Sequence, residues 1–232
     1  MSPKPKLVFL TGAGISAESG IQTFRGADGL WENHRIEDVA TPGAWRRDPN
    51  LVLRFYNERR KNVMAAQPNL AHQTIVDLES DFDVHVVTQN IDDLHERAGA
   101  KKVLHLHGEI LKARSSCDQS LVYPLEHWEI KIGDVCEKGS QLRPHIVWFG
   151  EAVPAMDEAI EIAASAEIVA VVGTSMTVYP AAGLIDFAPP NCRIFFVDPA
   201  DLTGRIRSRV DKHFQCGATV GLPALADLLR NS

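Results

Sequence analysis

Short apolar runs rich in Val, Ile and Phe recur along the chain and predict buried strands. Runs of this length are typical of a parallel sheet that is covered on both faces, since both sides of each strand must then be apolar. The predicted strands are Leu7–Leu10, Val84–Val87, Ile146–Phe149, Ile168–Val172 and Ile194–Val197.

Segments of helical periodicity lie between several of these strands. Apolar residues are spaced three and four apart over Asp48–Ala66, Leu70–Leu78 and Pro154–Ala166, and Pro68 separates the first two segments. Strands that alternate with helices predict a layered α/β domain with a parallel sheet.

Composition sets the size and the class of the protein. With 232 residues, of which 45% are hydrophobic and 23% charged, the chain can bury a substantial core, and one large domain with a smaller appendage fits this length. The net charge of −6 comes without a basic run, so we expect no nucleic-acid partner and no binding to an anionic membrane surface.

The N-terminal segment and the cysteines indicate the compartment. The apolar stretch Leu7–Leu10 is too short for a signal peptide or a membrane span, so a cytoplasmic protein is expected. The four cysteines lie far apart, which differs from a disulfide scaffold and predicts free thiols.

A glycine-rich segment, Gly12-Ala-Gly-Ile-Ser-Ala17, follows the first predicted strand and matches the G-x-G-x-x-G/A pattern. Glycines at these positions allow a tight turn and let backbone N–H groups approach a pyrophosphate. A plain glycine-rich turn between strand and helix is the less favoured alternative for this motif. A dehydrogenase would need a second strand and an acidic residue about 20 positions later. Here the loop Thr23–Trp31 and a long helical region come before the next strand, which argues against simple hydride transfer.

Five blocks of sequence together carry a more specific signal. They are Gly12–Gly26, Thr88–Asp92, His105–Glu109, Val147–Glu151 and Gly173–Ser175. In content and in order these blocks resemble the signatures of the sirtuin family. One departure is Gln22, where many sirtuins have proline.

The resemblance implies a fold with two parts. A Rossmann-like large domain would comprise about residues 1–26, 69–112 and 145–232, and a smaller inserted domain about 27–68 and 113–144. The small domain would consist of a helical module and a degenerate zinc-ribbon-like module. NAD and an acyl-lysine substrate would meet in the cleft between the two domains.

The resemblance also implies the residues of an NAD site. Carried over by position, they are Gly12, Ala13, Gly14, Ile15, Thr23, Phe24, Arg25, Trp31, Gln89, Asn90, Ile91, Asp92, Gly173, Thr174, Ser175, Asp198 and Ala218. Asp198 takes a place where sirtuins often have asparagine, and its carboxylate could still accept a hydrogen bond from a ribose hydroxyl.

The chemistry that the resemblance implies consumes NAD and transfers the acyl group to ADP-ribose. Asn90 and Asp92 would orient the ribose and the carboxamide as nicotinamide leaves. The ribose 2′-hydroxyl then needs a base that titrates near neutrality, and His107 holds that place in the motif. His105, two positions earlier, would face the same side of a strand, so a metal pair is an alternative. We expect a structural role for His105.

The metal-binding module of the family is degenerate in this chain. Sirtuins usually hold zinc with two C-x-x-C pairs, whose places here are Ser115 and Asp118, then Cys136 and Gly139. A site built from Cys117, His127 and Cys136 is an alternative, but structural zinc favours closely paired thiolates. We expect no zinc. Apolar packing must then hold the module, through Leu121, Tyr123, Leu125, Trp128 and Ile132.

Two residues of a predicted helix suggest which acyl group is removed. Tyr56 and Arg59 are three apart and therefore share a helix face, which by itself also fits a solvated helix with an amphipathic tyrosine. Tyr-x-x-Arg at this place resembles the sirtuin subclass that accepts acidic acyl groups, and Ala40 matches the small residue that widens its acyl pocket. Removal of succinyl, malonyl and acetyl groups is predicted.

We expect acyl-lysine proteins or peptides as substrates and a monomeric enzyme. An extended peptide would add a strand between the segment of Val147, Phe149 and Gly150 and the segment near Val178. Two alternatives stay open: mono-ADP-ribosyl transfer or NAD hydrolysis, and a non-catalytic sensor of NAD or ADP-ribose.

Overall fold

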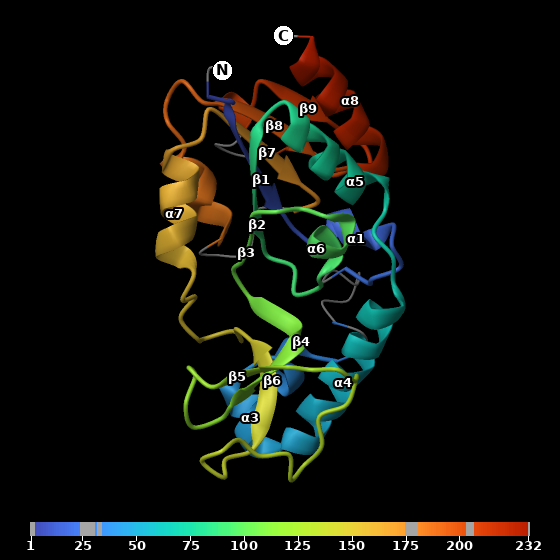
Figure 1. Cartoon of the computed structure of the whole chain (residues 1–232), viewed down its shortest axis with the longest axis vertical. Helices are drawn as coiled ribbons and strands as arrows, with labels where there is room; N and C mark the ends of the chain where they lie inside the picture. The colour runs from blue at the N-terminus through green and yellow to red at the C-terminus, as the bar shows by residue number, and fades with distance from the viewer. Residues whose placement is uncertain (1–2, 24–30, 32–33, 175–180, 203–206, 232) are drawn as a thin grey trace.

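A six-stranded parallel sheet forms the centre of the larger part of the molecule (Figure 1). The computed structural model describes residues 3–23, 31, 34–174, 181–202 and 207–231. The sheet order is β3-β2-β1-β7-β8-β9, and every pairing is parallel. Its strands are β1 (Lys6–Thr11), β2 (Asp83–Thr88), β3 (Val103–His105), β7 (Ile168–Val172), β8 (Arg193–Val197) and β9 (Lys212–Phe214). This order is the Rossmann order, which confirms the predicted fold class.

Helices cover both faces of this sheet, as the continuous apolar strands predicted. Successive side chains of a strand point to opposite faces, so Leu7 and Phe9 enter one core and Val8 and Leu10 the other. The first core is closed by α5 (Leu70–Asp77) and α8 (Ala218–Arg230), the second by α7 (Met156–Ala164) and the 3-10 helix η2 (Ala181–Phe187). Figure 1 shows α5 and α8 on one side of the sheet and α7 on the other.

The long insertion between β1 and β2 is helical. It contains α1 (Gly14–Ala17), α2 (Ile36–Val39), α3 (Pro42–Arg47), α4 (Pro49–Ala65), α5 and η1 (Leu78–Ser80). Helix α4 begins where the sequence predicts, because the Asp48 side chain caps it by accepting from the Leu51 N–H at 2.9 Å. The three predicted helices are confirmed as α4, α5 and α7; the pattern missed the short α6 (Leu94–Ala98) and α8.

A separate antiparallel sheet, ordered β5-β4-β6, builds the smaller part. Its strands are β4 (Gly108–Ser115), β5 (Val122–Pro124) and β6 (Leu142–Ile146). The predicted parallel strand Ile146–Phe149 is therefore wrong. Ile146 ends β6, and the next residues form a connecting segment in which Val147 N donates to His107 O and Phe149 N donates to Ala40 O. An apolar run marks burial, and here that burial comes from a cluster around Trp148 rather than from the central sheet.

The smaller part has its own core, which differs from the expected one. Leu53, Ala113 and Ile130 form it, with Leu125 packed against them. Trp128 and Ile132, expected inside, are 40% and 52% exposed. The buried Arg60 contributes instead: its guanidinium donates to the backbone oxygens of Ile110 and Trp128 and so ties α4 to β4 and to the following loop. Burial lowers the pKa of Arg60 to about 10.

The antiparallel sheet runs from Gly108, where β4 begins, to Ile146, where β6 ends, and so includes residues on both sides of the predicted segment 113–144. The domain bounds stay a prediction. Figure 1 shows β4, β5, β6, α3 and α4 together at the end of the molecule away from both termini. None of the helices in the described part of the chain combines the length and the apolar character needed to span a bilayer.

Candidate active site

A cavity of about 630 Å³ opens where the carboxyl ends of the parallel strands face the smaller part. In an open parallel sheet, ligands bind beyond these strand ends, where the strand order reverses. Here the reversal falls between β1 and β7. The predicted residues that line the cavity are Gly12, Ala13, Gly14, Thr23, Trp31, Ala40, Tyr56, Arg59, Gln89, Asn90, Ile91, Asp92, His107, Val147, Phe149, Gly150, Gly173, Thr174, Asp198 and Ala218.

One predicted residue lies elsewhere, and four cannot be placed. Ile15, expected to bind the cofactor, is fully buried in the core of the sheet, because its position on α1 turns its side chain away from the cavity. Phe24, Arg25, Ser175 and Val178 lie outside the described residues.

The glycines at the floor of the cavity let two turns pack against each other. A Cβ atom on Gly14 would lie 2.6 Å from Gly173 Cα, and one on Gly12 would lie 2.6 Å from Thr174 Cβ. Gly173 has a φ of +62°, in the left-handed region that favours glycine. The Gly14 N–H donates to Gly173 O at 2.8 Å. The turns after β1 and β7 thus lie in direct contact, with room for a ligand above them.

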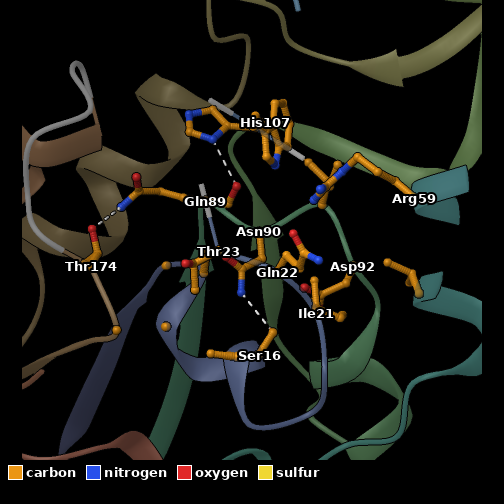
Figure 2. A pocket seen from close by; sticks show the side chains of 18 of the residues that line it. Ser16, Ile21, Gln22, Thr23, Arg59, Gln89, Asn90, Asp92, His107 and Thr174 are labelled. Atoms are coloured by element: carbon orange, nitrogen blue, oxygen red, sulfur yellow. Dashed lines mark hydrogen bonds between the residues drawn. The ribbon is translucent and has the colours of Figure 1, made fainter. Parts of the chain in front are cut away.

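His107 reaches the cavity with the tautomer of its neutral ring fixed by one hydrogen bond. Its Nδ1 lies 3.0 Å from the backbone oxygen of Gln89, as Figure 2 shows. A carbonyl oxygen can only accept, so Nδ1 carries the proton and Nε2 is the unprotonated nitrogen. Burial lowers the pKa of His107, which keeps the ring neutral at neutral pH. The ring can therefore take up a proton at Nε2.

Asn90 lies beside the first turn of α1, where Ser16 holds its side chain, and Asp92 lies near it (Figure 2). Asn90 Nδ2 donates to Ser16 Oγ at 3.2 Å, and Asp92 Oδ1 accepts from the Leu94 N–H at 3.2 Å. Burial raises the pKa of Asp92. These polar groups stand at fixed positions at the inner end of the cavity.

His105 has a structural role, as expected. Its Nδ1 bonds the Asn90 backbone oxygen at 2.9 Å and its Nε2 bonds Glu96 at 2.8 Å. Burial opposes the charged ring, but the Glu96 carboxylate outweighs burial and raises the pKa of His105. The charged ring holds the loop that carries Asn90.

Tyr56 and Arg59 enter the cavity from α4. Both side chains are buried, and the Arg59 guanidinium stacks over the Trp31 ring, 4.2 Å from its centre. Figure 2 shows Arg59 reaching inward from the side opposite Gln89 and Thr174. Tyr56 Oη accepts from Trp148 Nε1 at 3.1 Å, and burial raises the pKa of Tyr56, so the phenol keeps its proton. The buried guanidinium of Arg59 thus stands beside the Tyr56 phenol. The oxygen of this phenol already accepts a hydrogen bond from Trp148, and its O–H group is a hydrogen-bond donor.

Trp148 is in turn held by a cluster of charged side chains. The Arg143 guanidinium lies 3.3 Å from the centre of the indole ring, and a Glu151 carboxylate oxygen accepts from the backbone N–H of Trp148 at 2.9 Å. Glu151 also pairs with Arg143 at 2.8 Å and with Arg114 at 3.0 Å. Burial opposes ionisation of Glu151, but these arginines outweigh it and lower its pKa. The cluster fixes the indole that orients Tyr56.

A family model described as "Sir2 family" matches residues 12–180, which is most of the chain. The chain belongs to the Sir2 family. The sirtuin is 53% identical, over 87% of its length and 96% of the relative, to an "NAD-dependent protein deacylase" from Aggregatibacter actinomycetemcomitans. It is 48% identical, over 96% of its length and 95% of the relative, to one from Helicobacter pylori (strain ATCC 700392 / 26695).

Solved structures agree with this assignment. A crystal structure described as a Sir2 homologue in complex with NAD superimposes with a TM-score of 0.87 at 40% identity, covering 98% of the sirtuin and 90% of that chain. The family resemblance and the Rossmann-like fold are confirmed.

The place of the family's zinc contains a hydrogen-bonded cluster in this sirtuin. Ser115 Oγ lies 3.3 Å from Cys117 Sγ and 3.2 Å from Cys136 Sγ, and it accepts from the N–H groups of Cys117 and Asp118. Over the part of the chain that the structure describes, no group of three or more His, Cys, Asp or Glu is placed to hold a metal ion. A zinc-free module stays a prediction.

Sequence reasoning assigned no role to several residues that line the cavity, and three of these hold other parts of the site in place: Ser16, Trp148 and Glu151. Each lies within a sequence block that pointed to the family, but no role was assigned to it. The signal for Trp148 was available, since a buried indole N–H usually requires an acceptor. Its partner, Tyr56, is 92 residues away and could not be inferred from spacing.

Proposed function

We propose that this sirtuin is an NAD-dependent protein-lysine deacylase that removes succinyl, malonyl and acetyl groups and releases nicotinamide and O-acyl-ADP-ribose. One observation carries the proposal: a single cavity contains a neutral imidazole, His107, and a buried cation with a phenol, Arg59 and Tyr56. The first fits acyl transfer to a sugar hydroxyl, and the second fits an acyl group that ends in a carboxylate.

The residues at the strand ends fit NAD. The packed glycine turns after β1 and β7 leave backbone groups facing the cavity, which suits a pyrophosphate. Gln89 Nε2 donates to Thr174 Oγ1 at 3.2 Å and links the ends of β2 and β7 (Figure 2). Asp198 lines the cavity just after β8, where its carboxylate can accept from the adenosine ribose. NAD supplies the leaving nicotinamide and the acyl-accepting ribose.

His107, Asn90 and Asp92 would serve the nicotinamide end. Nε2 of His107 takes the proton of the ribose hydroxyl that attacks the activated acyl group, and the lowered pKa keeps this nitrogen free at neutral pH. The amide of Asn90, held by Ser16, and the carboxyl of Asp92, held by the Leu94 N–H, orient the ribose and the carboxamide.

Arg59 and Tyr56 would select the acyl group. A guanidinium can hold a carboxylate with two parallel hydrogen bonds, and the Tyr56 O–H can add a third. Ala40, buried beside the cavity, leaves room for a longer acyl chain. An acetyl group fits the same space but makes none of these ionic contacts.

A substrate peptide would lie along Val147, Phe149 and Gly150. The N–H groups of Val147 and Phe149 are already used by His107 O and Ala40 O, so the peptide would pair with the carbonyls of this segment and with Gly150. That the enzyme acts as a cytoplasmic monomer, without nucleic acid or membrane, stays a prediction from the sequence.

Replacing the buried arginine tests the acyl selectivity. In Arg59→Met we expect kcat/KM for a succinyl-lysine peptide to fall roughly 10- to 100-fold, the loss of hydrogen bonds to a charged group, and kcat/KM for the acetyl peptide to change far less. Arg54→Met, exposed on the same helix, is the matched control. Equal desuccinylation in Arg59→Met and in the wild type would refute the assigned selectivity.

The rival activities, ADP-ribosyl transfer and NAD hydrolysis, need the same nicotinamide pocket but no acyl pocket. Arg59 and Tyr56 on the cavity wall favour the deacylase. Nicotinamide release that needs no acyl peptide would favour the rivals.

A further inference from the structure

Two cysteine thiols from distant segments meet beside one hydroxyl in the smaller part. Cys117 follows the end of β4, and Cys136 lies in the loop that leads to β6. Cys117 Sγ lies 3.3 Å and Cys136 Sγ 3.2 Å from Ser115 Oγ. Both sulfurs thus lie against the same hydroxyl oxygen. They are therefore neighbours in the fold.

The two thiols differ in exposure. Cys117 is exposed, whereas Cys136 is buried, with 5% of its surface accessible. Of the other cysteines, Cys192 is buried and Cys216 is half-buried. A solution oxidant therefore meets Cys117 first.

We propose that Cys117 and Cys136 form a reversible disulfide by exchange with a low-molecular-weight disulfide such as oxidised glutathione. The Cys117 thiolate attacks one sulfur of the small disulfide, which breaks the S–S bond and releases one small thiol. The Cys136 thiolate then attacks Cys117 Sγ, forms the protein S–S bond and displaces the second small thiol. Two protein thiols are oxidised, and one small disulfide is reduced to two thiols.

The surroundings favour the second step. Ser115 Oγ lies 3.3 Å from Cys117 Sγ and 3.2 Å from Cys136 Sγ, so the attacking sulfur is already close to the sulfur that it must reach. Thiol–disulfide exchange depends on such access, and the short approach favours ring closure.

Peptide mapping tests this site without reference to deacylation. Reduced full-length protein is treated with oxidised glutathione in the presence of a chelator, alkylated, digested without reductant and analysed by mass spectrometry. We expect a Cys117–Cys136 cross-linked peptide with no retained glutathione, while Cys192 and Cys216 are recovered alkylated. Glutathione retained on Cys117 beside a free Cys136, or prior reaction of Cys216, would overturn the proposal.

Two variants separate the steps. Cys136→Ser should retain one glutathione on Cys117, because no second thiol displaces it. Cys117→Ser should leave Cys136 free, because its thiol is buried. Loading of Cys136 in Cys117→Ser at the wild-type rate would contradict the entry step. Mapping of the wild type stands by itself if either variant folds poorly.

Discussion

The imidazole of His107 determines the pH range of the proposed chemistry. Its Nδ1 bond to Gln89 leaves Nε2 as the free nitrogen, while its burial outweighs the opposing effect of that bond and lowers the pKa below the ordinary 6.5. His105, two residues away, has the opposite shift because Glu96 faces it. Surroundings, rather than residue type, thus separate two histidines of one motif.

This difference predicts the pH profile. His107 can act as a base only in its neutral form, so activity should rise as the pH increases through its pKa. Because that pKa is lowered, kcat/KM for an acyl peptide should reach half of its maximum below pH 6.5 and a plateau at higher pH. The profile is measured from pH 5 to 9, with circular dichroism over the same range as the control for folding. A half-maximum above pH 7 would contradict the assignment.

The hydrogen bond from the Trp148 indole to Tyr56 should contribute to the selectivity for acidic acyl groups. Trp148→Phe keeps an aromatic ring under Arg143 but removes the N–H that bonds Tyr56 Oη. The ratio of desuccinylation to deacetylation should fall by roughly 2- to 10-fold, the value of one neutral hydrogen bond.

A double-mutant cycle with Tyr56→Phe provides the control for that prediction. If Trp148 acts by orienting the phenol, the two losses overlap, and the double variant is no worse in this ratio than Tyr56→Phe. Fully additive losses, or an equal fall for both peptides, would show that the indole acts in another way.

At the scale of elements, the turns after β1 and β7 form the floor of the cavity, and they can do so only by packing directly against each other. In Gly14→Ala, the new Cβ meets Gly173 backbone at 2.6 Å, which no rotamer can relieve. We expect the free energy of unfolding to fall by about 1–3 kcal/mol and NAD affinity to fall with it. Urea denaturation and NAD titration measure both quantities.

Gly43→Ala, in α3, is the matched control for that prediction. Its Cβ would come within 3.3 Å only of the flexible Arg47 side chain, and alanine favours a helix. Its stability should not fall. If Gly14→Ala were as stable as Gly43→Ala and bound NAD normally, the tight packing of the turns would not matter.

Some helices and strands of this protein could be predicted from the sequence pattern, and others could not. Helix α4 was predictable, because Asp48 caps it, Pro49 starts it and its periodicity is long. Strands β3 and β9, of three residues each, carry too few positions for a pattern. Helix α8 was missed because Pro223 lies inside it. Ile146–Phe149 was assigned to the wrong sheet, since hydrophobicity reports burial and not the identity of the neighbour.

At the scale of the whole molecule, the cavity joins residues from Gly12 to Ala218. The resemblance predicted more than half of its described lining, since motif residues lie where strands end and strand ends meet at one edge. Contacts across the fold, such as Trp148 with Tyr56 and Ser115 with Cys136, lay beyond the sequence, because they depend on how the smaller part folds back.

The most direct test of the account is mass spectrometry of a succinyl-lysine peptide incubated with the purified protein, with and without NAD. We predict NAD-dependent loss of the succinyl group with formation of nicotinamide and O-succinyl-ADP-ribose in equal amounts, and loss of this turnover in His107→Ala. Nicotinamide formed at the same rate without peptide, or full turnover in His107→Ala, would contradict it.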